Sequence, residues 1–144
     1  MRTLKEYQEI IIEWSKRYSI NDVNECEYDK ANVLYQLYGD HNVYGRDTLL
    51  YIGISTNADS RIKQHLNGVF GYVHNLSVSF GKIECYDDSL EVPESILIAC
   101  HKPSYNKEFI HDLPQNAKQH KIIIINNGDN GDLKTCCTNF WWVD

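Results

Sequence analysis

The sequence has no long apolar run and no excess of basic residues. The longest uninterrupted apolar segment covers residues 96–100, far short of the ~20 residues that a membrane-spanning helix needs. Lysine and arginine number 14 against 20 aspartates and glutamates, which gives a formal net charge of −6. This balance argues against a protein that long-range charge alone holds to nucleic acid or to an anionic membrane, although it leaves room for a local basic site.

The sequence also lacks a disulfide framework and a signal peptide. Its five cysteines are an odd number without regular spacing, so we expect reduced thiols. Arg2 and Lys5 stand near the N-terminus, but Glu6, Glu9 and Glu13 interrupt the apolar core that a signal peptide requires. We therefore expect a cytoplasmic protein with no membrane contact.

The composition is that of a folded domain of ordinary size. The chain has 144 residues, of which 42% are hydrophobic, 24% charged and 12% aromatic, and these values exclude disordered and low-complexity classes. No repeat or linker divides the sequence. We therefore predict a single domain over residues 1–144.

The N-terminal segment has the spacing of an amphipathic helix. Apolar residues recur there at steps of three and four, and they are Leu4, Tyr7, Ile11, Trp14 and Tyr18. Thr3 and Glu6 fit a capping box at its start. We predict a helix over residues 3–19, followed by a polar, acidic connection over residues 20–31.

Two segments in the first half of the chain have the composition of paired β-strands. Residues 33–38 and 48–54 are rich in β-branched, aromatic and leucine side chains. Gly39 to Asn42, together with Gly45, supply turn residues between them. The pattern predicts a β-hairpin.

The central part of the chain predicts two helices and a strand. Capping and stop signals indicate a short helix over residues 61–66 and a longer one from residues 87–89 to about His101. A strand is expected between them, over residues 78–86.

The C-terminal part predicts a second hairpin, over residues 121–143. Four consecutive isoleucines lie in the expected strand 121–126, and the Asn- and Gly-rich residues 127–132 form its turn. The last strand is expected over residues 134–143. The order of elements predicts a mixed α+β (α/β) fold.

Within this pattern, Val33-Leu34-Tyr35 and Tyr51-Ile52-Gly53 form a motif in two halves. The motif resembles that of the GIY-YIG nuclease superfamily, most closely its restriction-endonuclease branch. Val33 stands where the family prefers glycine and Leu34 where it prefers isoleucine. The second half, Tyr51-Ile52-Gly53, matches the family motif at all three positions. Fifteen residues separate Tyr35 from Tyr51, slightly more than is usual in the family.

Residues further along the chain follow the order of the same family. They are Arg61, His65, Glu94, Pro103 and Asn106. A tyrosine followed later by Tyr-Ile-Gly is by itself weak evidence for the family. The two halves of the motif together with these downstream residues, all in the family's order, are much stronger evidence. The resemblance implies a nuclease core over residues 31–110, with a small central antiparallel sheet flanked by helices. The N-terminal helix 3–19 and the C-terminal hairpin 121–143 would be additions to it.

The resemblance implies metal-dependent hydrolysis of DNA phosphodiester bonds. Glu94 would hold a single Mg²⁺, or Mn²⁺, and Arg61 would counter the charge that develops on the phosphate. Tyr51 would donate to a phosphate oxygen. Tyr35 is the family's candidate general base, but an ordinary phenol titrates near ~10, so His65 remains an alternative base.

Two further site residues have supporting roles in this interpretation. Gly53 would bind substrate by letting the backbone approach it closely, and Asn106 would hold the site through its amide. Glu91 lies three residues before Glu94 and is an alternative metal ligand.

Other features have two interpretations each. Cys136 and Cys137, with the histidines at 101, 111 and 120, invite a zinc site, but no Cys-x-x-Cys spacing supports one. We favour a strand on which the two cysteines point to opposite faces. The aromatic run 140–142 is either a base-stacking platform or a strand that closes the core.

The expected partner is DNA, in restriction, defence or a mobile element. Residues 81–120 carry seven acidic against four basic residues, so this face is a candidate contact for a protein partner. The alternative function is a catalytically silent nucleic-acid- or protein-binding module. Because one site cuts one strand, we expect a homodimer formed through the N-terminal helix, the aromatic tail or both.

Overall fold

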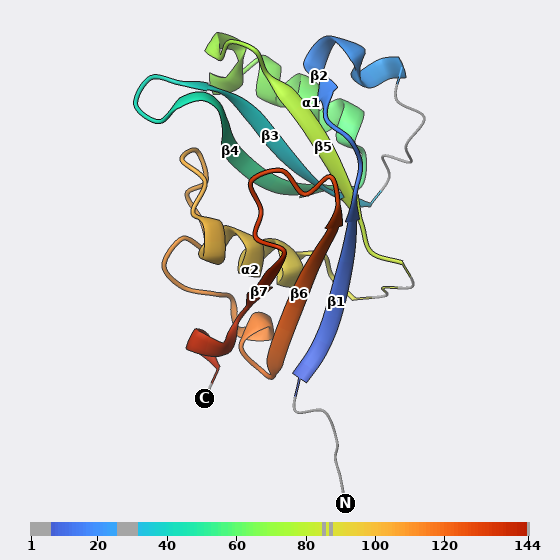
Figure 1. The fold of residues 1–144 in the computed structure, drawn as a ribbon, viewed down its shortest axis with the longest axis vertical. Coiled ribbons are helices and arrows are strands. Elements are labelled where there is room, and N and C mark those ends of the chain that lie inside the picture. The colour runs from blue at the N-terminus through green and yellow to red at the C-terminus, as the bar shows by residue number, and fades with distance from the viewer. Residues whose placement is uncertain (1–6, 26–31, 85, 87, 144) are drawn as a thin grey trace, which may run out of the picture.

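The computed structural model describes residues 7–25, 32–84, 86 and 88–143. Within these residues, seven strands form one curled, mostly antiparallel sheet, and two α-helices pack against it (Figure 1). The strand order is β4-β3-β5-β1-β6-β7, and β2 pairs with β5. The mixed α+β class is therefore confirmed. Among the described residues, no helix is both long and apolar enough to cross a membrane.

The predicted first hairpin is confirmed and forms one end of the sheet. It consists of β3 (Val33–His41) and β4 (Gly45–Ser55), which pair antiparallel. The next strand, β5 (Ser77–Lys82), pairs antiparallel with the other side of β3 and is shorter than the predicted 78–86. β3 is thus a central strand, and its first seven residues are buried.

Both predicted helices are confirmed, and they cover opposite faces of β3. The first, α1 (Ala58–Leu66), begins at Asn57, whose side chain accepts a hydrogen bond from the backbone N–H of Ser60. Its Ile62 packs with Tyr35 in one core cluster. The second, α2 (Glu91–His101), packs with the other face, and the sheet curls around it (Figure 1).

The predicted N-terminal helix is wrong. The segment forms strand β1 (Tyr7–Trp14), followed by the short strand β2 (Tyr18–Ser19). Ile10, Ile12 and Trp14 are buried, so burial alternates with the period of two that a strand requires. Three consecutive isoleucines favour a strand, and β1 lies parallel to the isoleucine run of β6 (Lys121–Gly128). The predicted capping box at Thr3 and Glu6 lies outside the described residues.

The expected connection over residues 20–31 contains local structure. Ile20–Glu25 form a 3₁₀ helix, and residues 26–31 lie outside the described part of the chain.

The C-terminal hairpin is confirmed, but its second strand is much shorter than predicted. β7 covers Cys136–Thr138 only, with Cys136 exposed and Cys137 buried as the alternation predicts. Phe140–Trp142 form a 3₁₀ helix instead of a core-closing strand. The cause is Asn139, whose fully buried side chain accepts from the N–H of Ile122 and donates to two carbonyl groups, which turns the chain out of the sheet.

Candidate active site

The two tyrosines of the motif lie on one face of the β3–β4 hairpin. Tyr35 pairs with Gly53 and Leu37 with Tyr51, so Tyr35 and Tyr51 are diagonal neighbours whose ring centroids lie 6.1 Å apart. Helix α1 follows β4 directly and covers this face. It brings His65 so close that the Tyr35 hydroxyl lies 2.8 Å from Nε2 of His65. Tyr35, Tyr51 and His65 therefore lie together on one face of the sheet.

Gly53 has a different role from the one that the sequence suggested. A Cβ atom at residue 53 would lie 2.6 Å from both Cζ and the hydroxyl oxygen of Tyr35. Real Cβ atoms do not approach other atoms so closely, so glycine is needed because the Tyr35 ring lies directly over β4. Gly53 therefore positions Tyr35, and the group that approaches its backbone is this ring.

The Tyr35–His65 pair is uncharged at neutral pH. Tyr35 has no exposed surface. Burial, followed by the neighbouring Tyr51, raises the pKa of Tyr35 well above its usual value, although Arg61 opposes this shift. Burial and then the charge of Arg61 lower the pKa of His65 to about 4. Both groups therefore keep their neutral forms, and which of them donates the hydrogen bond between them depends on the tautomer of His65.

Arg61 links this pair to the neighbouring tyrosine. A hydrogen bond to Tyr35 raises the pKa of Arg61, partial burial lowers it, and a hydrogen bond to Tyr51 adds to the increase. The guanidinium also donates to Gln64 with an Nη1–Oε1 distance of 3.0 Å. Arg61 is thus a charged group close to the phenol hydroxyls of Tyr35 and Tyr51.

Glu94 reaches the same place from the opposite side of the sheet. It lies in the first turn of α2, yet it shares a cavity of about 340 Å³ with Tyr51 and Arg61. Side chains from the two faces of the sheet can meet there because β4 is the edge strand, and no further strand in the described part of the chain separates them. Of the two candidate carboxylates, Glu94 lines this cavity, whereas Glu91 is not among its lining residues.

The Glu94 carboxyl is held in an environment that disfavours its charge. Burial raises its pKa to about 7, and the charges of Glu91 and Glu108 add to this effect. Arg61 and the backbone N–H of Ile54 act in the opposite direction but do not cancel it. A cation bound at Glu94 would therefore relieve an existing electrostatic cost.

Asn106 builds the wall of the cavity. Its Nδ2 donates to the carbonyl of Ile52 and its Oδ1 accepts from the N–H of Ile52, both at 3.0 Å. The N–H of Tyr105 donates to the carbonyl of Leu50 at 2.9 Å. The segment thus hydrogen bonds to the edge of β4 as a strand would. Because both amide groups of Asn106 bond the main chain, its role is to hold the site.

Sequence reasoning missed several residues that line the cavity. They are Ile54, Ile98, Tyr105, Lys107, Glu108 and Phe109. Four of them flank Asn106 in the chain, which is the one signal that pointed to this segment. Lys107 adds a second cation and Glu108 a second carboxylate beside Arg61 and Glu94.

The zinc interpretation receives no support from the geometry. In the part of the chain that the structure describes, no three histidine, cysteine or acidic side chains are grouped so as to hold a metal. Both ring nitrogens of His101 are also engaged, since Nδ1 lies 2.8 Å from the carbonyl of Leu97 and Nε2 accepts from the N–H of Lys134. His101 therefore fastens α2 to the β6–β7 connection.

Comparison with known proteins identifies no relative: no protein-family model, no curated protein and no solved structure matches the chain.

Proposed function

We propose that the protein is a metal-dependent endonuclease of the GIY-YIG type, which hydrolyses phosphodiester bonds in DNA. The observation that carries this proposal is the convergence of Tyr35, Tyr51, Arg61, His65 and Glu94 from four different elements. These residues are the ones that the resemblance selects, and separate strands and helices bring them together around one edge of the sheet. The antiparallel β4-β3-β5 unit, with α1 and α2 on opposite faces, agrees with the expected core over residues 31–110.

The groups at the cavity suit a phosphodiester. Arg61 remains charged at any working pH and has several donors for phosphate oxygens. Tyr51 lines the same cavity, and in this proposal its hydroxyl donates to another phosphate oxygen. In this proposal Arg61 and Tyr51 stabilise the negative charge that develops on the phosphate oxygens during hydrolysis.

The Tyr35–His65 pair supplies the route for a proton. A free phenolate at Tyr35 is disfavoured because burial raises its pKa. The hydroxyl of Tyr35 lies 2.8 Å from Nε2 of His65, and in the tautomer that is protonated at Nδ1 this nitrogen accepts the hydrogen of Tyr35. In this proposal a water molecule gives its proton to Tyr35 while Tyr35 passes its own to His65, so His65 holds the proton at the end of the step. Because Tyr35 is fully buried in the free protein, the route requires that substrate binding admits this water from the neighbouring cavity.

Glu94 is the residue that would hold the metal. Mg²⁺ binds in many sites through one or two carboxylates, with water as the remaining ligands, and burial together with Glu91 and Glu108 raises the pKa of Glu94, so a bound cation would favour its charged form. When bound, the ion stabilises negative charge on the leaving oxygen. Glu94 and its hydrogen bond from Ile54 fix the side of the cavity on which this happens.

One observation favours a second candidate function. Glu91 and Glu108 add negative charge beside Glu94, and without a cation this charge repels phosphate. A catalytically silent module that binds nucleic acid or protein is the alternative.

The expected homodimer cannot form through an N-terminal helix, because the N-terminal segment is a strand within the sheet. The N-terminal segment is strand β1, which is hydrogen bonded to β5 on one side and to β6 on the other. The aromatic tail remains a candidate, because Trp141 is 88% exposed. We propose the dimer through this tail alone.

The test is cleavage of plasmid DNA by the purified protein in the presence of Mg²⁺ or Mn²⁺. Glu94→Ala should abolish cleavage, whereas Glu91→Ala, on the same helix turn, should retain it. Arg61→Ala should slow the reaction by about 10²–10³-fold, as the loss of one oxyanion donor does in other enzymes, and Lys63→Ala is its control on the same helix. Cleavage by Glu94→Ala at the rate of the unmodified protein would contradict the proposal.

A further inference from the structure

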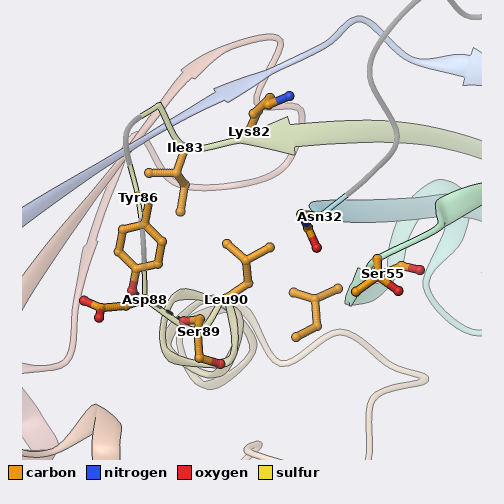
Figure 2. Close-up of a pocket in the computed structure, with 10 residues that line it drawn as sticks. Asn32, Ser55, Lys82, Ile83, Tyr86, Asp88, Ser89 and Leu90 are labelled. Carbon is orange, nitrogen blue, oxygen red and sulfur yellow. Dashed lines mark hydrogen bonds between the residues drawn. The ribbon is translucent and has the colours of Figure 1, made fainter.

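A second and larger cavity lies beside the candidate active site. Its volume is about 700 Å³, within the range of roughly 300–1,000 Å³ that is typical of small-molecule sites. Three segments contribute to it: Asn32 before β3, residues 54–56 at the end of β4, and Lys82, Ile83, Tyr86 and residues 88–90 from the end of β5 to the start of α2 (Figure 2). Ile54 lines both cavities. A ligand that enters the larger cavity therefore lies next to whatever is bound at Glu94.

The walls of the larger cavity differ in polarity. Figure 2 shows Ile83, Tyr86 and Leu90 on one side and Asn32 and Ser55 on the other. The Tyr86 hydroxyl donates to the carbonyl of residue 89 at 3.4 Å, which helps to orient the ring. The cavity thus offers apolar and aromatic surface facing polar groups.

The polar side retains hydrogen-bonding capacity. Among the residues that the structure describes, the amide of Asn32 has no hydrogen-bond partner. The hydroxyl of Ser55 accepts from the N–H of Asn57 at 3.0 Å, so its own hydrogen remains to be donated. An amide and a hydroxyl together offer donors and acceptors to the edge of a planar ligand.

The charge of the cavity is balanced. Among the described residues that line it, Lys82 and Asp88 are charged, one of each sign, and both are exposed. A phosphate or a metal ion would meet no surplus of opposite charge here, unlike in the smaller cavity with Arg61 and Glu94. The walls favour a neutral, flat ligand with a polar edge.

We propose that this cavity binds one nucleobase of the DNA substrate, unstacked from its neighbours, beside the phosphate that is cleaved. The position of that phosphate rests on the function proposed above. Bases bound in this way stack on aromatic rings and present their edges to polar side chains. Because a paired base inside a duplex cannot enter a protein cavity, the preferred substrate has an unpaired nucleotide next to the scissile bond.

Binding of three DNA duplexes in EDTA tests this proposal without cleavage. The first has one unpaired nucleotide at its centre, the second has an abasic residue at that place, and the third is fully paired. Fluorescence anisotropy should show the first bound about five- to 150-fold more tightly than the second, the range expected for one stacked base. The fully paired duplex should bind no better than the abasic one.

Variants of residues that line the cavity test whether the preference for the unpaired nucleotide arises there. Tyr86→Phe keeps the flat ring and should keep the preference, whereas Tyr86→Leu keeps apolar volume and should lose it. Asn32 is exposed, but its φ of 52° lies in the left-handed region, which alanine tolerates less well than asparagine. Asn32→Ala should therefore weaken the preference at a modest cost to stability, which urea denaturation measures. Tyr44→Leu changes an exposed aromatic residue at the turn between β3 and β4, which does not line the cavity, and is the control that should bind as the unmodified protein does.

The outcomes separate this proposal from the proposed function. Equal affinity for the unpaired and abasic duplexes, or an unchanged preference in both Tyr86→Leu and Asn32→Ala, would overturn the nucleobase site even if Mg²⁺ then supports cleavage of all three. A cavity-dependent preference for the unpaired nucleotide without any cleavage in Mg²⁺ would support the site and contradict the nuclease. The absence of any DNA binding would overturn the site.

Discussion

Glu94 provides the sharpest test of the electrostatics of the site, because its charge destabilises the fold. Burial and two neighbouring glutamates raise its pKa from 4.5 to about 7. The folded protein therefore binds more protons than the unfolded chain between these pH values, and stability falls as pH rises from about 4.5 to about 7. The difference corresponds to an upper limit of about 3 kcal/mol, since solvent screens a partly exposed carboxyl.

Glu94→Gln removes this cost while keeping the shape of the side chain and an oxygen that accepts from Ile54. We expect the variant and the unmodified protein to have similar free energies of unfolding at pH 4.5. At pH 8 the variant should be more stable by up to about 3 kcal/mol. Urea denaturation at a series of pH values measures this difference directly, because other titrating groups contribute equally to both proteins.

The same denaturation experiment, repeated with metal, tests the metal site proposed at Glu94. At pH 8, Mg²⁺ or Mn²⁺ should stabilise the unmodified protein as a ligand of the folded state does, and should leave Glu94→Gln unchanged. Parallel pH profiles of the two proteins would refute the assignment of a strained carboxyl to Glu94. Equal stabilisation of both proteins by the metal would refute the metal site.

Three further predictions concern the residues that build the site. Gly53→Ala places a Cβ against the ring of Tyr35 and should lower the free energy of unfolding by about 1–3 kcal/mol, and an unchanged urea midpoint would contradict this packing. Asn106→Ala leaves two main-chain groups of β4 without partners and should cost about 2–4 kcal/mol, whereas the exposed Asn116→Ala should cost almost nothing; equal costs would show that the clamp is absent. His65 has a pKa lowered to about 4, so its neutral form stabilises the fold and this contribution is lost as pH falls from about 6.5 towards 4; His65→Gln should flatten that part of the profile, and an unaltered acid slope would contradict the burial of a neutral imidazole.

Local signals were sufficient to predict the centre of the fold. The β3–β4 hairpin has strand-forming residues on both sides of a glycine-rich turn, and α1 and α2 have clear start and stop residues. The N-terminal segment shows the limit of such signals. Tyr7, Ile11 and Trp14 fit a helical spacing, but the isoleucines of β6 provide a parallel partner that only long-range pairing reveals.

The short β7 shows the same limit at the other end of the chain. The aromatic residues after it have the composition of a strand, yet the buried Asn139 bonds the main chain of a neighbouring strand and loop and ends the pairing. A hydrogen bond between residues distant in the sequence decided the local conformation.

For the candidate site, the sequence by itself determined which side chains are present and in what order along the chain. The hairpin register could also be anticipated, and it places Tyr35 and Tyr51 on one face. Only the tertiary structure decided that Glu94 reaches this pair around the edge of β4, and that Asn106 seals that edge. Burial and charge proximity are properties of the folded chain, and they set the raised pKa of Glu94 and the lowered pKa of His65.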